Sequence, residues 1–151
     1  MSVSESESWR TDRPAVLVVC DDPDAGELLS RLLERDGWPV GLAISGAGGL
    51  TALCDAEGRY GVVVVELHVP AAMQLLASIR DTPGVAGTRV VICAGPDGNR
   101  GGAWLAGTDG YLVHPFDAGH FLAEVAAVVA RPDAERDDHR QRQIGLPNSP
   151  S

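Results

Sequence analysis

Polar residues that could do chemistry follow several apolar runs of this sequence. One run is followed by Cys20, Asp21 and Asp22, and two later runs are followed by Glu66 and by His114. Carboxylates that meet in space can bind Mg²⁺, and an imidazole beside a carboxylate can form an ion pair or exchange a proton. No nucleophile with an orienting base, phosphate-binding loop or cofactor fingerprint accompanies them. We therefore expect no enzymatic activity and no cofactor, with Asp21, Asp22 and Glu66 as weak candidates for a Mg²⁺ site.

The segment that must position these residues, 14–131, alternates apolar runs with amphipathic stretches. Such alternation is typical of repeated strand-helix units. We predict strands over 15–19, 40–44, 61–67, 89–93 and 110–113. Four successive valines in the third strand indicate that both of its faces are covered, as at the centre of a parallel sheet. Five such units predict an α/β, doubly wound (βα)5 domain of the flavodoxin-like class, whose site lies at the carboxyl ends of the strands.

Capping residues and glycines predict where the helices begin and end. Asp22 and Pro23 predict a helix start, and Gly37 predicts the end of that helix. Asp117 is the expected cap of the last helix. Other helices are predicted over 48–56, 70–80 and 98–107. The last of these should be a poor helix, because it is rich in glycine.

The composition excludes several classes of function. With 151 residues, the chain has room for one domain of ordinary size. Its formal net charge of −9 would repel the phosphate backbone of a nucleic acid. Neither a basic amphipathic stretch nor an apolar run of ~18 residues is present, so we expect no membrane insertion. Without a basic start followed by an apolar stretch, we expect a cytoplasmic protein.

The types of basic residue and the positions of the cysteines exclude further kinds of reaction and metal site. All twelve basic residues are arginine, which excludes mechanisms that need a lysine. The three cysteines are Cys20, Cys54 and Cys93, and they lie in apolar segments without the spacing of a metal site. We expect them to be reduced thiols in the core.

Four segments in strand order resemble the receiver domain of bacterial response regulators. They are VLVVCDDPD, VVVVELHVP, VVICAG and DGYLVHPFD, and together they extend over most of 14–131. The resemblance implies the fold predicted above. In that family, two acidic residues after the first strand hold Mg²⁺, and an aspartate after the third accepts a phosphoryl group. A Thr or Ser after the fourth strand and a Lys before Pro in the fifth contact the phosphoryl group.

Most functional positions of the family carry altered residues in this chain. The acidic pair falls on Cys20 and Asp21, the phosphoacceptor on Glu66, the hydroxyl on Ala94 and the lysine on His114. Only Asp21 keeps the family's residue type. A thiol supplies no hard oxygen ligand and an alanine supplies no hydrogen-bond donor, so we expect that aspartyl phosphate does not form. The resemblance also places Tyr111 at the family's aromatic switch position.

Two interpretations stay open for each half of the predicted site. Glu66 could mimic the phosphorylated state, or it could be a solvated carboxylate without a switching role. His114 could bridge to Glu66, or it could be a neutral histidine bonded to the backbone. The expected function is that of a pseudo-receiver, a protein-interaction module or accessory subunit that works without phosphorylation. The alternative is a single-domain orphan response regulator of a two-component system with a non-canonical phosphoacceptor.

Residues outside the predicted domain, and one aromatic residue within it, are candidates for partner binding. We expect polar tails over 1–13 and 132–151, because neither segment has an apolar period. The candidates are Trp9, Trp104, Arg136, Arg140 and Arg142. Trp9 would fill an apolar pocket of a large protein partner, or it could be a tail residue without a role, and the arginines would pair with acidic side chains of the partner. Trp104 could instead fill the core behind a loosely packed helix.

A more specific resemblance concerns the partner. The chain resembles an actinobacterial orphan receiver that associates with respiratory complex I, the proton-pumping NADH dehydrogenase. Its all-arginine composition, rich in Gly and Ala, suits such an origin. The resemblance implies an accessory subunit at the cytoplasmic side of a membrane complex.

Overall fold

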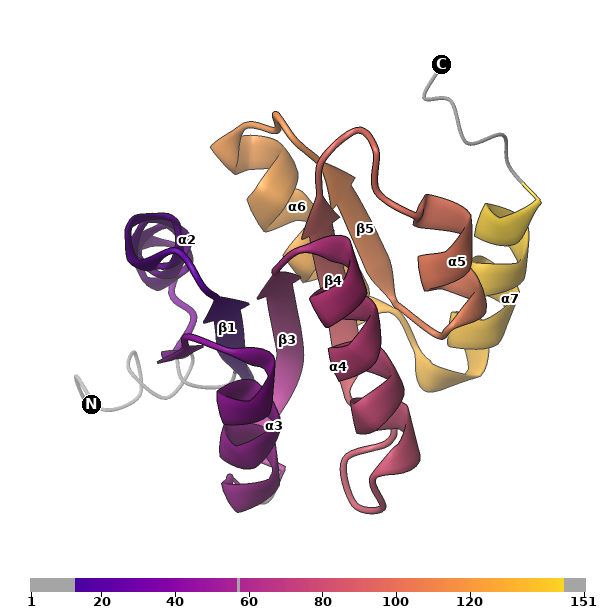
Figure 1. Cartoon of the computed structure of the whole chain (residues 1–151), viewed down its shortest axis with the longest axis horizontal. Helices are drawn as coiled ribbons and strands as arrows, with labels where there is room; N and C mark the ends of the chain where they lie inside the picture. Colours follow the sequence, from indigo (N-terminus) through magenta and orange to yellow (C-terminus); the bar gives the residue numbers. More distant parts are fainter. Residues whose placement is uncertain (1–12, 57, 146–151) are drawn as a thin grey trace, which may run out of the picture.

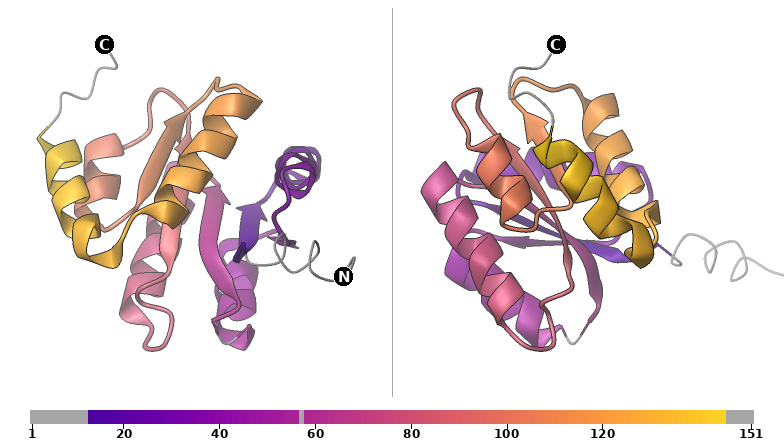
Figure 2. Two further views of the ribbon diagram at one scale, coloured as in Figure 1. Left: turned by 180° about the vertical axis from the view of Figure 1, so that it is seen from behind. Right: turned by 90° about the vertical axis from the view of Figure 1, so that its right-hand side faces the viewer.

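A five-stranded parallel sheet with helices on both faces forms the centre of the protein (Figure 1, Figure 2). The computed structural model describes residues 13–56 and 58–145. The strands stand in the order β2-β1-β3-β4-β5, and each neighbouring pair is parallel. This arrangement confirms the predicted doubly wound, flavodoxin-like α/β fold.

The strands lie where the sequence predicts them, to within a residue at each end. They are β1 (Ala15–Cys20), β2 (Val40–Ala43), β3 (Tyr60–Glu66), β4 (Arg89–Ala94) and β5 (Gly110–Val113). The helices are α2 (Pro23–Arg35), α3 (Gly46–Asp55), α4 (Val69–Asp81), α5 (Arg100–Leu105), α6 (Ala118–Ala130) and α7 (Asp133–Ile144). Helices α2 and α6 cover one face of the sheet, and α3, α4 and α5 cover the other.

Strand β3 shows how the sheet divides the core into two halves. Its four valines from Val62 to Val65 are at most 1 % exposed, as expected for a central strand. Successive side chains of a strand point to opposite faces. Val63 and Val65 therefore join the cluster under α3 and α4, whereas Val62 and Val64 join the cluster under α2 and α6.

Side-chain caps begin two helices at the predicted residues. The Asp22 carboxylate accepts the backbone N–H of Asp24 at 3.0 Å, at the start of α2. The Asp117 carboxylate accepts the N–H of His120 at 2.7 Å, at the start of α6. Gly37 follows α2 with φ of 93°, in the left-handed region that favours glycine. The caps fix the loops at the carboxyl ends of β1 and β5, where the predicted site lies.

Helix α5 is shorter than the predicted 98–107, because the chain turns close to Tyr111 before the helix begins. A Cβ atom at Gly98 would lie 2.4 Å from the Tyr111 hydroxyl oxygen, so this position has no room for a side chain. Asn99 then caps the helix by accepting the N–H of Gly102 at 3.0 Å. The glycines that weaken this helix thus permit its close approach to β5.

The predicted burial of the cysteines is correct for two and wrong for one. Cys20 and Cys93 are buried in β1 and β4, whereas Cys54 is exposed on α3. Leu53 directs its side chain into the core and is 2 % exposed. One step along a helix turns the next residue by about 100°, so Cys54 faces solvent.

The largest difference from the sequence analysis lies after residue 131. The sequence predicts a polar tail over 132–151, but Asp133–Ile144 forms helix α7, which packs against α5 (Figure 2). No residue of α7 is buried, so the helix lacks the apolar stripe by which a sequence pattern predicts packing. Residues 1–12, with Trp9, and residues 146–151 lie outside the described part of the chain.

Candidate functional site

The carboxyl ends of the strands bring together most of the residues that the sequence predicts for the site. Cys20 ends β1 and lies in register with Glu66, the last residue of β3. His114 directly follows β5, and its Nε2 atom lies 3.4 Å from a carboxylate oxygen of Glu66. Parallel strands end at the same edge of the sheet, which is why residues so far apart in the sequence meet here.

The contact between Glu66 and His114 is open to solvent on one side. The side chain of Glu66 is 21 % exposed and that of His114 is 41 % exposed. The imidazole also stacks on the ring of Phe116, with 4.5 Å between the ring centroids. Of the two interpretations of His114, this geometry favours the bridge to Glu66. An ion pair with this exposure contributes about 0–1 kcal/mol to stability. The contact therefore orients the two side chains but adds little to the stability of the fold.

The acidic residues at this edge do not converge on a metal site. Asp22 is engaged as the cap of α2, and Asp21 is exposed. Within 13–56 and 58–145, no three His, Cys, Asp or Glu side chains are placed where they could share a metal ion. The weak Mg²⁺ candidates Asp21, Asp22 and Glu66 therefore form no ligand set in the described structure.

Cys20, which the resemblance matches to an acidic residue of receivers, is a buried thiol. Its Sγ atom donates to the Asp22 carbonyl oxygen at 3.4 Å. Burial raises the pKa of Cys20, and the nearby carboxylates act in the same direction. A neutral thiol cannot replace a carboxylate as a ligand of Mg²⁺.

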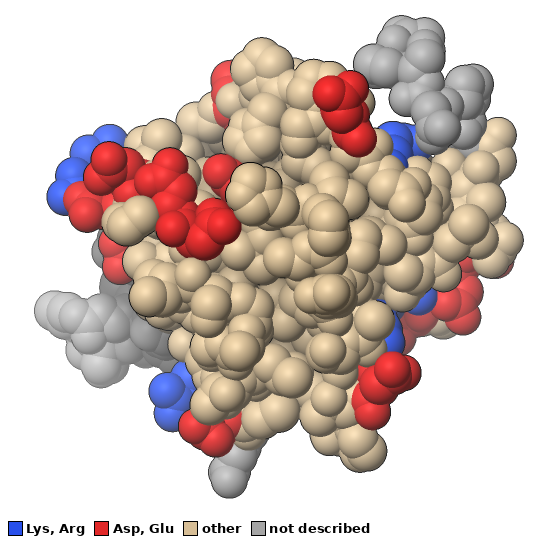
Figure 3. All heavy atoms as spheres, viewed as in Figure 1, with Lys and Arg blue, Asp and Glu red and all other residues tan. Residues whose placement is uncertain are grey.

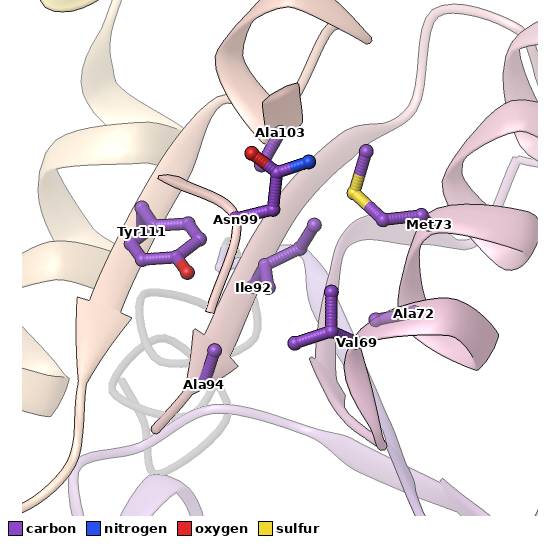
Figure 4. A pocket seen from close by; sticks show the side chains of 8 residues that line it. All are labelled: Val69, Ala72, Met73, Ile92, Ala94, Asn99, Ala103 and Tyr111. Carbon is purple, nitrogen blue, oxygen red and sulfur yellow. The ribbon is translucent and has the colours of Figure 1, made fainter. Parts of the chain in front are cut away.

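Ala94, at the end of β4, is the residue that the resemblance matches to the hydroxyl position of receivers. It is 5 % exposed and lines a cavity of about 10 Å³ (Figure 4). Tyr111 lies on one side of this cavity and Met73 on the other. The cavity has room for about one water molecule at most. Tyr111, at the switch position, is partly buried against the core, and this burial raises its pKa.

A larger groove lies beside the Glu66–His114 pair, between α2 and the start of α6. Its volume is about 340 Å³, and its apolar wall comes from Leu28, Leu29 and Leu32 of α2 together with Phe116. Acidic side chains gather over α2 (Figure 3). Exposed apolar side chains in a recess of this kind are typical of a binding surface.

A second cluster of charges, which the sequence analysis missed, surrounds Asp109 before β5. This residue is 2 % exposed and therefore needs partners for its charge. Arg136 and Arg140 of α7 approach Oδ1 at 2.8 and 2.9 Å. Arg80 of α4 approaches Oδ2 at 3.0 Å, and the Val90 N–H donates to the same oxygen at 2.9 Å. The cluster ties α4, β4 and α7 to the start of β5.

The arginines of this cluster use their other donors on the backbone. Arg80 donates to the carbonyl oxygens of Ala86, Thr88 and Gly107. Arg136 donates to Gly87, and Arg140 donates to Thr108. No signal in a single sequence pairs three scattered arginines with one aspartate, which is why the cluster was not predicted.

The structure corrects three of the predicted partner-binding residues. Arg136 and Arg140 are only 13 % and 16 % exposed, because they bind Asp109 within the chain. Trp104 is 3 % exposed and packs edge-on against His139 of α7, so it fills the core and is no exposed anchor. Arg142 is exposed and stays a candidate. Trp9 lies outside the described residues.

Comparisons with known proteins agree with this architecture. The chain is 30 % identical over 120 residues to the transcriptional regulatory protein PrrA of Mycobacterium tuberculosis, an alignment that covers 78 % of the chain and 51 % of PrrA. It is 33 % identical over 119 residues to KdpE of the same organism, covering 77 % of the chain and 51 % of KdpE. The chain thus spans about half the length of the curated relatives it matches. No protein-family model matches it.

Solved structures with the same fold include two response regulators. The chemotaxis response regulator CheY4 of Vibrio cholerae matches with a TM-score of 0.67 at 20 % identity, covering 77 % of this chain and 98 % of CheY4. A response regulator receiver domain protein from Clostridium thermocellum matches with a TM-score of 0.67 at 27 % identity, covering 77 % of this chain and 94 % of that one. Among the described residues, no helix has both the length and the apolar character to cross a membrane.

Proposed function

Since these relatives and structures support membership of the response-regulator receiver family, we propose that the chain is a receiver-type regulator that binds another protein and forms no aspartyl phosphate. The observation that carries the proposal is the contact between Glu66 and His114 at 3.4 Å. The resemblance matches these residues to the family's phosphoacceptor and lysine. Their contact gives the site a built-in pair of opposite charges when His114 is protonated.

The Glu66 carboxylate is poorly placed to accept a phosphoryl group. Its side chain is one methylene longer than that of aspartate, and His114 engages one of its oxygens. Transfer of a phosphoryl group also needs cations that neutralise the charge that develops on its oxygens. The described residues gather no ligand set for a metal ion, and Cys20 is a buried thiol.

The positions that would sense a phosphoryl group support the same proposal. Ala94 supplies a methyl group where a hydroxyl would donate to a phosphoryl oxygen. Tyr111, which the resemblance places at the switch position, is partly buried and packs against the core. We infer that the domain holds one conformation and presents one surface.

The surface we assign to the partner is the groove between α2 and α6. Leu28 in its wall is 59 % exposed and adjoins the partly covered apolar side chains of the groove. The opposite edge of the sheet is a poorer choice, because α7 covers α5 and Trp104 there. Loss of the partner on substitution of Leu28 by Asn, with normal folding, would support this assignment.

To test whether the protein takes up a phosphoryl group, the full chain is incubated with acetyl phosphate and Mg²⁺ and its intact mass is measured. We expect no phosphoryl adduct. The positive control restores the family residues by Cys20→Asp, Glu66→Asp, Ala94→Thr and His114→Lys, and this variant should gain an adduct. A phosphoryl adduct on the unchanged chain would contradict the proposal.

A second candidate function is that of a two-component response regulator with a different phosphoacceptor. The similarity to transcriptional regulatory proteins and to response regulators favours it. Asp21 is exposed at the same edge of the sheet and is a candidate acceptor for this function. An adduct that is lost in Asp21→Asn and kept in Glu66→Gln would establish this alternative.

The partner itself stays a prediction. We propose a protein assembly, with respiratory complex I as the specific case, and neither nucleic acid nor direct membrane insertion. Purification of the tagged full chain at its native abundance, followed by mass spectrometry, identifies what it binds. An eluate without complex I subunits would count against that case.

A further inference from the structure

The groove between α2 and α6 has an apolar wall that no other described part of the chain covers. Leu28 is 59 % exposed, whereas its neighbour Leu29 is 5 % exposed. The volume of about 340 Å³ falls in the range of roughly 300–1,000 Å³ at which proteins bind compact ligands. The groove can therefore accept a large aromatic side chain.

Arg13, the first described residue, lies on the face of the sheet that carries this groove. The Arg13 guanidinium lies over the ring of Trp38, at 4.6 Å from the centroid, and donates to the Asp36 carbonyl oxygen at 2.5 Å. Trp38 belongs to the core cluster under α2 and α6, and Asp36 is the C-cap of α2. Arg13 is thus fixed beside the C-terminal end of the helix that forms the groove wall.

The segment that precedes Arg13 is long enough to reach the groove. Trp9 precedes Arg13 by four residues, and an extended chain of four residues spans at most ~14 Å. Leu32 lines the groove and lies one helical turn before Asp36, about 6 Å along the axis of α2. Trp9 is the one aromatic residue in the first twelve, which otherwise consist mainly of Ser and Glu.

We propose that Trp9 packs into the groove between α2 and α6 of its own chain. The tether through Arg13 gives Trp9 a high effective concentration at the groove, which a separate protein does not have. A second copy would in addition lose translational and rotational freedom on binding. The N-terminal segment then covers the surface that we assign to the partner, so a partner must displace Trp9 or bind it together with the groove.

The test places a nitroxide spin label next to Trp9, by Ser8→Cys in a Cys54→Ser background. Cys54 is the exposed cysteine, whereas Cys20 and Cys93 are buried and remain unlabelled. We expect the label to broaden the backbone amide signals of Leu28 and Leu32. The amide of Leu105, in α5 on the other face of the sheet, should stay sharp.

The control that isolates Trp9 is the same labelled chain with Trp9→Ala. Relaxation enhancement at Leu28 should then fall severalfold, because Arg13 still tethers the segment but nothing holds it in the groove. Trp9→Phe should keep most of the enhancement. Equal enhancement with and without Trp9 would overturn the proposal.

A mixing experiment distinguishes the chain's own segment from that of a second copy. Spin-labelled chain without isotope is mixed with unlabelled, nitrogen-15-enriched chain. Broadening of Leu28 in the mixture would show that another molecule fills the groove and would overturn the proposal. The experiment does not involve Glu66, so its failure is distinguishable from failure of the phosphodonor test.

Discussion

Burial of the Asp109 carboxylate removes it from water, and a lone charge in that position would be strongly destabilising. Burial by itself raises the pKa of Asp109, but the hydrogen bond and charge of Arg136, the charge of Arg140 and the Val90 N–H outweigh it. The net pKa therefore lies below its ordinary value. The carboxylate stays charged in the folded protein and organises the arginines around it.

Replacing Asp109 by alanine should lower the free energy of unfolding by about 3–5 kcal/mol, because it leaves arginines buried without their counter-charge. Urea denaturation of the variant and the parent chain measures this difference. The matched control is Asp137→Ala, since Asp137 also pairs with Arg140 but is 92 % exposed. It should change stability little. Equal effects of the two substitutions would contradict this account.

At the scale of elements, α7 is held mainly by polar contacts. Besides the contacts with Asp109, Arg89 binds Asp133 at 2.9 Å and Arg100 donates to the Gln143 side chain at 2.9 Å. His139 adds the edge-on contact with Trp104, whose ring centroid is 5.5 Å away. A tail would have no effect on the core, whereas this helix covers a buried tryptophan and completes the Asp109 cluster.

The double substitution Arg136→Gln and Arg140→Gln should release α7 while keeping its helix propensity. We expect faster hydrogen exchange of the Trp104 indole N–H and of the amides over 133–144. Arg142→Gln, at an exposed position of the same helix, should leave both exchange rates unchanged. Unchanged protection in the double variant would show that the ion pairs do not hold the helix.

At the scale of the whole molecule, the attachment of α7 makes stability depend on pH. Partial burial and the charges of Arg131 and Arg142 lower the pKa of His139. A histidine whose folded pKa is lowered takes up its proton first in the unfolded chain. Its contribution is therefore present above the unfolded pKa of about 6.5 and is lost as the pH falls from that value through the lower folded pKa.

We expect the free energy of unfolding to decrease as the pH is lowered from about 7.5 to about 5.5, an interval centred on the ordinary histidine pKa of about 6.5. His139→Gln should flatten this part of the profile, measured by urea denaturation at several pH values. The control His120→Gln, whose side chain is 77 % exposed, should leave the slope unchanged. A profile that is the same in parent and His139→Gln would exclude His139 as its cause.

Two carboxylates, the buried Asp109 and the partly buried Glu124, have opposite effects on stability at lower pH. Asp109, with its lowered pKa, contributes stability above the unfolded value of about 3.9 and loses it as the pH falls through its folded pKa. Burial raises the pKa of Glu124, so its contribution is lost as the pH rises through its folded pKa. Acid unfolding below about pH 4 should therefore depend on Asp109 and not on Glu124. Asp109→Asn should shift the pH at which the chain unfolds in acid.

The sequence by itself determined the strands, the order of strand-helix units and the edge of the sheet where the site lies. The valine run from Val62 to Val65 predicted a central strand, because only a strand covered on both faces is apolar at every position. Asp22 and Asp117 predicted helix starts, because a capping carboxylate acts on backbone groups two or three residues away. The meeting of Glu66 with His114 followed from the common direction of parallel strands. The strands and helix starts depend on local periodicity and local hydrogen bonds, whereas the meeting of Glu66 with His114 depends on the direction that parallel strands share.

Only the tertiary structure decided what residues 133–144 do. Helix α7 has no apolar period, and Arg136 and Arg140 look like a solvated charged tail until Asp109 is known to be buried beside them. The same burial turns Trp104 from a predicted partner anchor into a core residue. Long-range charge pairing leaves no periodic trace in a sequence, because a guanidinium finds its carboxylate through the fold and not through spacing along the chain.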